Sequence, residues 1–478
     1  MTINRFKVLL FFVSFSFNLD FESVRFLGLG ANYSTISGGY HASKTNPATL
    51  SSSDGLKINL FSTNFGISNN LFNLNKVNDI NGSSLDDPYA VKYYPKSLIT
   101  DAIKNNGWLF SVYSNTPIPL MNLSYKSYSL SSQSKFFLDF KIPDILLNTV
   151  LEGNTLGEKL SINANAELMA VNETCFTKSF DLNEIKLGIG VKYLLGLYYL
   201  GLEEVKESYF LTDSTSFNAK GYYLAKQGIG GSGVAVDLGL LTSETESGWK
   251  FGFSLNNLFG TVKWSSDSFI RQKLEPTLKS SLENMYLRQG ESFFIKFLLD
   301  SLNAVRLTDV DFSDLVSTEM IKVIRLQDTT GLNIEASNLI AISENDFLIK
   351  SDSLTNAEFD QSIQKPFKTV YPKYFHLGFS KRTQDDIHFH FDLSAGFSKS
   401  IGGYDNWLLA FGSEFLRFKW IDLRSGLAVG GKHRLSFSLG LGLKLYPVNV
   451  DLGLVLNNAL SINSMKGLTG GLDFSLQF

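Results

Sequence analysis

Residues 435–445 read LSFSLGLGLKL, and every second position in this stretch is Leu or Phe. Ser, Gly and Lys occupy the positions between them. Successive side chains of a β-strand point to opposite faces, so the stretch predicts a strand with one apolar face and one small or polar face. The same alternation recurs over most of the chain, for example at 185–193, 387–397 and 448–456. We therefore predict an all-β fold.

Strand length and the nature of the second face separate two all-β classes. Strands of soluble sandwiches are usually about five or six residues long, whereas a tilted strand needs about nine to eleven residues to cross a hydrocarbon core. The alternating segments reach that length, and Gly and Ser on their second face suit a crowded or hydrated lumen. Backbone groups in lipid must all be paired, so such a sheet has to close on itself. We expect a transmembrane, closed antiparallel outer-membrane β-barrel of roughly 12 to 16 strands, with a soluble β-sandwich as the alternative.

The composition excludes several other classes of protein. Aromatic residues make up 13% of the chain and charged residues 19%, while mean hydropathy is +0.02. A helical membrane protein would need long apolar runs, and a disordered chain would hold fewer apolar residues. The net charge of −3 implies no basic face for a nucleic acid. The lone Cys175 permits neither an internal disulfide nor a cysteine-based metal site.

The first residues look like an export signal. Residues 1–7 contain Arg5 and Lys7, and residues 8–17 form a short apolar run. This order is typical of a secretory signal peptide, and the run is too short to span a bilayer as a helix. We predict a signal peptide at 1–18 and export to the outer membrane of a Gram-negative-type bacterium. A first buried strand is the alternative interpretation.

The rest of the chain divides into four predicted segments. A Gly-, Ser- and Asn-rich hatch or plug at 19–55 precedes the first part of the barrel at 56–264, in which a short helix is predicted at 143–151. Denser charge and apolar side chains at helical spacing then predict a helical insert at 265–370, which would form a cap or plug. The second part of the barrel follows at 371–478. The residues of the insert whose spacing indicates a helix include Phe294, Phe297, Leu298 and Leu302.

The final predicted strand alternates up to Phe478. It resembles the β-signal that outer-membrane barrels present to their assembly machinery. The apolar positions of this predicted C-terminal β-signal are Leu472, Phe474, Leu476 and Phe478.

Three stretches resemble segments of the long-chain fatty acid transporter (FadL-like) superfamily. Residues 38–50 (GGYHASKTNPATL) resemble its Asn-Pro-Ala-x-Leu segment, and residues 187–196 (LGIGVKYLLG) resemble its G-x-x-x-K-Y-x-x-G strand. Residues 233–264 resemble its strand pair around Asp-Leu-Gly and Asn-x-x-Gly-x-x-x-Trp. The pattern is similar to an uncharacterised branch common in Bacteroidetes, related to the PorV and PorQ components of type IX secretion.

This resemblance implies a barrel of about 14 strands with the hatch inside the lumen. It also implies that a hydrophobic ligand enters from outside and leaves towards the periplasm or laterally between strands. Asn46, Pro47 and Ala48 would then lie in or beside the hatch, whereas the alternative is an ordinary loop before the first strand. The long insert departs from the family pattern, and no ligand-pocket motif is recognisable.

His388 and His390 are two residues apart, so both point to the inferred lumen face of one strand, and Asp392 continues that face. Two imidazoles on one strand could form half of a metal site, but no carboxylate pair stands at ligand spacing. We interpret these residues as a lumen-facing polar stripe, with metal binding and catalysis as alternatives. The chain has no G-x-S-x-G elbow and no phosphate-binding loop. We therefore expect no enzyme activity, no cofactor and no metal, and we assign no catalytic residue.

Aromatic residues near the inferred strand ends could form girdles at the two membrane interfaces, with ordinary sheet packing as the alternative. They are Tyr193, Tyr198, Tyr199, Trp249, Trp264, Trp407 and Trp420.

The predicted function is to bind hydrophobic or amphipathic small molecules, or pass them across the outer membrane, after capture between wall and hatch. One alternative is a structural barrel that anchors a partner in an envelope or secretion complex without transport. Another is an outer-membrane hydrolase. The expected partners are membrane lipid, the barrel-assembly machinery, a hydrophobic ligand and a protein bound through 265–370, but no nucleic acid.

Overall fold

The computed structural model describes residues 23–52, 55–104, 106–153, 156–213, 216–264, 291–303, 321–325, 367–397, 400–432 and 434–478. The predicted signal peptide at 1–18 lies outside these residues. Within the described ranges, no helix is both long enough and apolar enough to cross a membrane.

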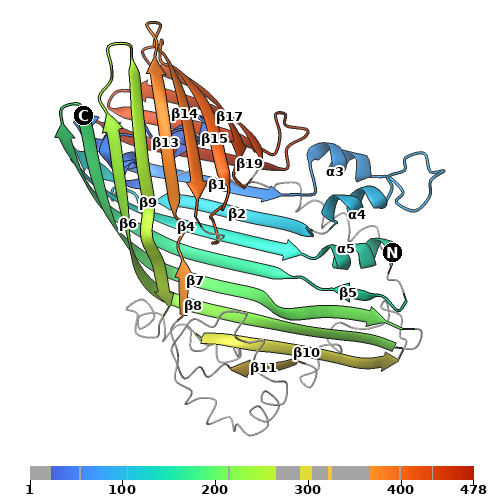
Figure 1. Ribbon diagram of the computed structural model, residues 1–478. Helices are drawn as coiled ribbons and strands as arrows, with labels where there is room; N and C mark the ends of the chain where they lie inside the picture. Colours follow the sequence, from blue (N-terminus) through green and yellow to red (C-terminus); the bar gives the residue numbers. More distant parts are fainter. Residues whose placement is uncertain are drawn as a thin grey trace.

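A ring of 14 antiparallel strands closes into a barrel (Figure 1). In ring order the strands are β1 (Leu56–Asn69), β2 (Trp108–Pro117), β4 (Tyr128–Ile142), β6 (Asn165–Leu182), β7 (Ile185–Thr212), β8 (Ser216–Thr242), β9 (Trp249–Trp264), β13 (Tyr374–Arg382), β14 (Ile387–Gly396), β15 (Trp407–Phe415), β16 (Ile421–Gly430), β17 (Leu435–Leu445), β18 (Val448–Asn457) and β19 (Gly467–Gln477). Pairing of β19 with β1 closes the ring, and the short β3 (Leu123–Tyr125) joins β1 to β4. The prediction of a closed antiparallel barrel with about 14 strands is confirmed.

The alternation in the sequence creates the two faces of the barrel wall. On β15, Leu409 and Phe411 are 45% and 47% exposed, whereas Ala410 between them is 2% exposed. The outer surface is therefore a band of large apolar side chains, and the inner surface consists of small and polar ones. A barrel surrounded by lipid needs this arrangement, because only apolar side chains are stable against the hydrocarbon core.

The connections between strands differ in length at the two ends of the barrel. At the end where β1 begins, the backbone N–H of Leu56 donates to the carbonyl of Phe478 at 3.1 Å. The short turns at this end include residues 183–184, 243–248, 383–386 and 446–447. Longer connections at the opposite end include 70–107 and the region from 265 to 366. Outer-membrane barrels have short periplasmic turns and longer extracellular loops, so we assign the two ends accordingly.

Two strands continue past the barrel at its extracellular end (Figure 1). β7 and β8 are 28 and 27 residues long, whereas about nine to eleven residues cross a bilayer. In its outer part β8 pairs with β10 (Glu291–Asn303), which in turn pairs with β11 (Ile321–Arg325). On the other side, β5 (Lys159–Ser161) pairs with β7. We call β5, β10, β11 and the adjoining parts of β7 and β8 the wing.

The prediction of a helical insert at 265–370 is wrong for the parts of it that the structure describes. Residues 291–303 and 321–325 are strands of the wing, and β12 (Phe367–Val370) pairs with β9. The residues thought to mark a helix, Phe294, Phe297, Leu298 and Leu302, lie on β10. Their run of apolar residues is compatible with either helix or strand. The outer part of β8 offers an edge with unpaired backbone groups, and pairing with that edge favours the strand. The other residues of the insert lie outside the described ones.

Short helices occupy two places. α2 (Val24–Leu27), η1 (Gly39–Lys44) and η2 (Pro47–Ser52) belong to the N-terminal segment. The helices of the extracellular rim are α3 (Leu74–Ile80), α4 (Ser97–Ile103) and α5 (Asp144–Glu152). They pack around Ile103, Trp108 and Leu151, and α5 corresponds to the predicted short helix.

Five of the seven aromatic residues predicted to form girdles divide into two groups. Trp249 and Trp420 are exposed near the periplasmic end, and Trp407 is exposed near the extracellular end. Trp264 and Tyr199 are instead buried inside the barrel, so the girdle prediction is wrong for them. Irregular pairing of β6 with β7, and of β8 with β9, shifts the face to which later side chains point.

Candidate functional site

Residues 23–52, which we call the hatch, lie inside the periplasmic half of the barrel (Figure 1). Most of their side chains are buried. Within the hatch, α2 contacts β17, β18 and β19 on one side of the lumen, and η2 contacts β6, β7 and β8 on another. The hatch therefore crosses the lumen from wall to wall.

Glycines on the inner wall let the hatch backbone approach closely. A Cβ added at Gly188 on β7 would overlap the carbonyl carbon of Pro47, and one added at Gly239 on β8 would overlap Oδ1 of Asn46. Only a residue without a side chain fits at such positions. The Gly and Ser residues of the second strand face thus form a docking surface for the hatch, where the predicted residues Asn46, Pro47 and Ala48 lie.

Hydrogen bonds fix the same part of the hatch. The Asn46 Nδ2 amide donates to the backbone carbonyls of Ser34 and Leu240 at 2.7 and 3.1 Å. On β14, Oδ2 of Asp392 accepts from the backbone N–H groups of Tyr33 and Ser34, both at 2.9 Å, and from the Ser34 hydroxyl at 2.7 Å. Ser34 therefore connects two predicted residues, Asn46 and Asp392, that are far apart in the sequence.

The centre of the hatch contains two titratable rings. The Tyr40 hydroxyl donates to Oδ1 of Asp473 at 3.2 Å, and burial together with the charge of Asp473 raises the pKa of Tyr40 well above its usual range. Burial lowers the pKa of His41 well below its usual range, and the positive charges of Lys44 and Lys57 add to this effect. Both rings are therefore neutral at pH 7.

The predicted polar stripe lies on the lumen side of β14. His390 and Asp392 are buried and His388 is half-buried, while Phe389 between the histidines is exposed outward. On the neighbouring strand β15, Glu414 stands opposite His388. Arg25 of the hatch binds Glu414 through two hydrogen bonds of 3.1 and 2.9 Å.

Sequence reasoning missed a buried ionic network above the hatch. Lys192 Nζ lies 2.7 Å from Asp237, 3.3 Å from Glu173 and 2.8 Å from the Asn257 side-chain oxygen. Lys135 lies 3.4 Å from the other oxygen of Glu173. Each of these charges is 1% or 2% exposed at the side chain, so each depends on its partners.

The motifs that carry the family resemblance meet at this network. Lys192 is the lysine of the G-x-x-x-K-Y-x-x-G stretch, Asp237 belongs to Asp-Leu-Gly, and Asn257 and Trp264 belong to Asn-x-x-Gly-x-x-x-Trp. Gly188 from the first of these motifs contacts the hatch directly. The motifs were therefore the signal in the sequence, although their spacing does not show which residues touch.

At Asn257 the regular pairing of β9 with its neighbour in the wall is interrupted. β9 pairs with β13 up to Asn256 and with β12 from Thr261 onward, and Asn257 and Phe259 between these segments have φ values of 59° and 61°. The Asn257 amide donates to the carbonyl of Pro372 at 2.7 Å and bridges the interrupted segment. The wall here is closed by side-chain contacts more than by a regular β-ladder.

An apolar cluster fills the lumen between the network and the extracellular end. It contains Tyr113, Phe137, Met169, Val171, Leu194, Tyr199, Ala235, Val262, Trp264, Phe367, Tyr371 and Ile401. The rings of Tyr199, Trp264 and Phe367 lie within 5.5 to 6.3 Å of one another, centroid to centroid. These three rings form a compact aromatic layer.

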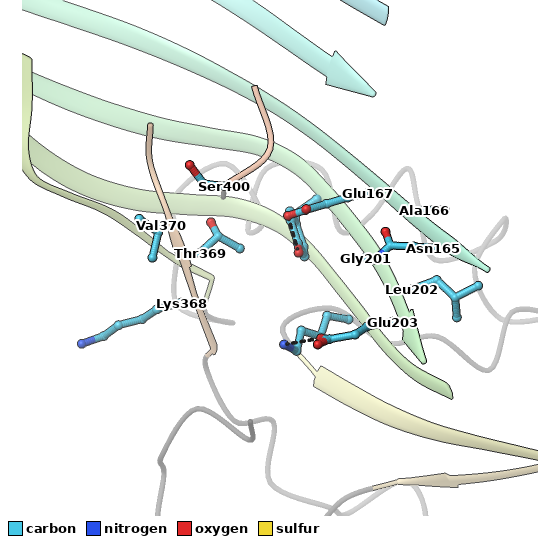
Figure 2. Close-up of a pocket in the computed structure, with 12 residues that line it drawn as sticks. Asn165, Ala166, Glu167, Gly201, Leu202, Glu203, Lys368, Thr369, Val370 and Ser400 are labelled. Atoms are coloured by element: carbon cyan, nitrogen blue, oxygen red, sulfur yellow. Dashed lines mark hydrogen bonds and ion pairs between the residues drawn. The ribbon is translucent and has the colours of Figure 1, made fainter. Parts of the chain in front are cut away.

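A cavity of about 460 Å³ borders this layer (Figure 2). On one side the cavity is lined by Tyr199 of the aromatic layer and by Lys368, which follows Phe367 in the sequence. The polar side chains of Glu167, Glu203 and Lys226 also line it. The Tyr199 hydroxyl donates to Oε1 of Glu167 at 2.9 Å. The cavity therefore combines an aromatic side with a charged rim.

The chain is similar to one family model and to several solved structures. The model of a family described as "Family of unknown function (DUF5723)" matches residues 47–224. No curated protein matches the sequence. A solved TodX deltaS2S3 mutant monoaromatic hydrocarbon channel is similar at 10% identity and a TM-score of 0.47, covering 95% of this chain and 99% of that chain.

Two further solved structures are similar over nearly their whole length. The Pseudomonas putida toluene transporter TodX has 10% identity and a TM-score of 0.42, covering 97% of this chain and 98% of that chain. The CymD monoaromatic hydrocarbon channel has 11% identity and a TM-score of 0.42, covering 95% and 96%.

The closed ring of strands and its apolar outer face define the chain as an outer-membrane β-barrel. The barrel of 14 strands with an N-terminal segment inside the lumen is the architecture that the FadL-like resemblance implies.

Proposed function

We propose that this barrel captures a hydrophobic or amphipathic small molecule at its extracellular end and passes it across the outer membrane. The cavity beside the aromatic layer is the observation that carries the proposal. Its volume of about 460 Å³ lies within the range of roughly 300–1,000 Å³ typical of small-molecule sites.

The lining of the cavity suits a molecule with an apolar body and a polar end. Tyr199 gives an aromatic surface on which a ring or an alkyl chain can lie. Glu203 and Lys226, whose charged atoms are 3.8 Å apart, stand at the rim where a polar end would meet water. The apolar body of the molecule would thus lie towards the aromatic layer, and its polar end towards the rim.

Passage requires movement, because packed side chains close the floor of the cavity. Trp264 is fully buried in the aromatic layer, and its ring nitrogen donates to the Thr369 hydroxyl at 3.0 Å. Below this layer a molecule can leave laterally past the interrupted pairing at Asn257, or towards the periplasm after the hatch moves. Trp264 lies at the start of both routes.

Replacing Trp264 by Ala tests the proposal against a matched change on the outer wall. Because the smaller side chain opens the floor, we expect Trp264→Ala to raise the initial rate of uptake several-fold, whereas Trp407→Ala, on the exposed outer face, should leave it unchanged. The measurement is uptake of radiolabelled oleate and toluene by Gram-negative cells that lack their own channels for these compounds. Equal amounts of folded barrel in the outer membrane are verified by heat-modifiable gel mobility.

Two results would contradict the proposal. Cells that contain the native barrel would take up neither probe faster than cells without it, or Trp264→Ala and Trp407→Ala would change uptake equally. The first result would refute the proposed transport function, and the second would refute the proposed route past the aromatic layer.

A second candidate function is to hold a protein partner at the cell surface. The observation that favours it is the wing, since β7 and β8 are far longer than a bilayer requires. Replacing residues 265–366 by a two-residue Asn-Gly turn would then abolish capture of a partner from the cell envelope while β9 still pairs with β12. Capture of the same proteins after the replacement would argue against this function.

A further inference from the structure

Two histidines and a glutamate meet at the periplasmic mouth of the barrel. His388 and His390 lie on β14, and Glu414 lies opposite His388 on β15. One ligand atom from each of the three side chains can be chosen so that all lie within 4.8 Å of one another. Zn²⁺ bonds of about 2.0–2.2 Å would require these side chains to turn towards one another.

His390 has donor and acceptor capacity that the described protein does not use. It is 1% exposed, and neither ring nitrogen has a hydrogen-bond partner among the described residues. Its Nε2 atom is 3.9 Å from Oε2 of Glu414, which is too long for a hydrogen bond. Buried polar atoms are nearly always paired, so an imidazole without a partner calls for an explanation. A metal ion would supply the missing partner for one of its nitrogens.

The set of ligands selects the kind of metal. Two imidazoles and one carboxylate, with a fourth position left for water, form a common zinc site. Magnesium and calcium prefer oxygen ligands only, so they fit these residues poorly. His388 is half-buried, which leaves a path by which an ion can enter from the periplasm.

Glu414 already has two cationic partners. Arg25 of the hatch donates to both carboxylate oxygens, and Arg424 Nε donates to Oε1 at 2.8 Å. Arg424 is also held by Asp422 at 3.1 Å and by Asp451. Arg25 is the more exposed of the two arginines, with 31% of its side chain accessible, so it is the one that can leave. A divalent cation next to both arginines would be repelled, which makes zinc and Arg25 competitors for Glu414.

We propose that His388, His390 and Glu414 form a Zn²⁺ site whose occupation displaces Arg25 from Glu414. Arg25 belongs to α2, and its two hydrogen bonds to Glu414 tie the start of the hatch to β15. Zinc would break this tie and loosen the hatch from the wall. The site lies at the opposite end of the barrel from the cavity, so zinc binding can be measured without the proposed transport.

Zinc titration of the full-length barrel in detergent, without a polyhistidine tag, tests the site. After treatment with a chelator, we expect one Zn²⁺ to bind per chain, and Co²⁺ in its place to give the visible absorption of a four-coordinate site. His388→Ala and His390→Ala should each weaken binding by at least ~100-fold, since even changes next to the ligands cost 10- to 100-fold. His376→Ala is the matched control, because this buried histidine of β13 bonds the Tyr33 hydroxyl and lies outside the trio. Less than one Zn²⁺ per chain, or equal weakening by His376→Ala, would overturn the site.

A second measurement tests the displacement of Arg25. Arg25→Gln removes the competing cation, so it should tighten zinc binding by about tenfold, the effect of losing a charge-assisted hydrogen bond. Zinc should also speed tryptic cleavage within the hatch of the native protein and leave His390→Ala unaffected. If zinc binds but neither Arg25→Gln nor zinc has these effects, the competition is refuted while the site stands.

Discussion

Gly239 illustrates how one absent side chain positions the hatch. Its Cα hydrogen faces Asn46 and Pro47, so that the two backbones approach within the space that a methyl group would fill. Well-packed protein interiors tolerate added groups poorly, because neighbouring atoms have to shift. The contact between wall and hatch thus requires that residue 239 has no Cβ atom.

Changing Gly239 to Ala should loosen the hatch. Overpacking of this kind costs about 1–3 kcal/mol, so we expect faster tryptic cleavage of the hatch and a lower thermal midpoint than in the native protein. Gly470→Ala is the matched control, because a Cβ at Gly470 meets no atom within 4 Å. Equal behaviour of the two variants would show that the close approach at Gly239 does not hold the hatch.

At the scale of elements, the buried ionic network joins strands that lie next to one another in the barrel wall. Lys135, Glu173, Lys192 and Asp237 come from β4, β6, β7 and β8. Asn257 adds β9, where the regular pairing is interrupted. The network therefore replaces part of the missing ladder, with charged side chains holding the wall where backbone pairing fails.

Replacing Lys192 by Met should destabilise the barrel strongly. The change leaves Asp237 without its closest cation, and breaking a buried ion pair costs about 3–5 kcal/mol. The matched change is Lys159→Met, which removes an exposed pair with Glu207 at 2.7 Å and should cost about 0–1 kcal/mol. Unfolding in urea, followed by tryptophan fluorescence, measures both. A smaller loss for Lys192→Met than for Lys159→Met would contradict a stabilising role of the network.

For the whole molecule, connection lengths determine which end faces outward. The rim helices, the wing and the cavity all lie at the end with long connections, whereas the hatch and the histidine–glutamate trio lie at the other. This orientation puts the proposed ligand capture outside the cell and the proposed zinc site towards the periplasm. The two proposed sites thus differ in access.

Cysteine labelling of intact cells tests this orientation. Cys175 is buried and should not react, so the native protein is the blank. Tyr89 is 96% exposed in a long connection and Met121 is 43% exposed in a turn at the opposite end. We expect a membrane-impermeant maleimide to label Tyr89→Cys in intact cells, and Met121→Cys only after the outer membrane is permeabilised. The reverse pattern would mean that the assignment of the two ends is wrong.

Local patterns in the sequence predicted the strands of the barrel correctly, but they did not predict the structure of the insert. Period-2 alternation, as at 435–445, arises from the geometry of a single strand and is therefore readable from neighbouring residues. The apolar run at 291–303 was misread as helical, because its strand conformation depends on pairing with β8 rather than on its own pattern. The faces of Tyr199 and Trp264 were misread because bulges earlier along the strands shift the alternation.

The amino-acid sequence by itself determined that this chain forms a closed barrel with an oily outside and a small-residue inside, since both follow from which residues alternate. It also indicated Asn46 as a hatch residue, and Asp392 and the two histidines as a polar stripe facing the lumen. Only the tertiary structure brought Glu414 to the histidines, Ser34 between Asn46 and Asp392, and Lys192 to Asp237. Those contacts depend on strand register and on the path of the hatch through the lumen, and residue spacing along one chain does not encode distances across a closed sheet.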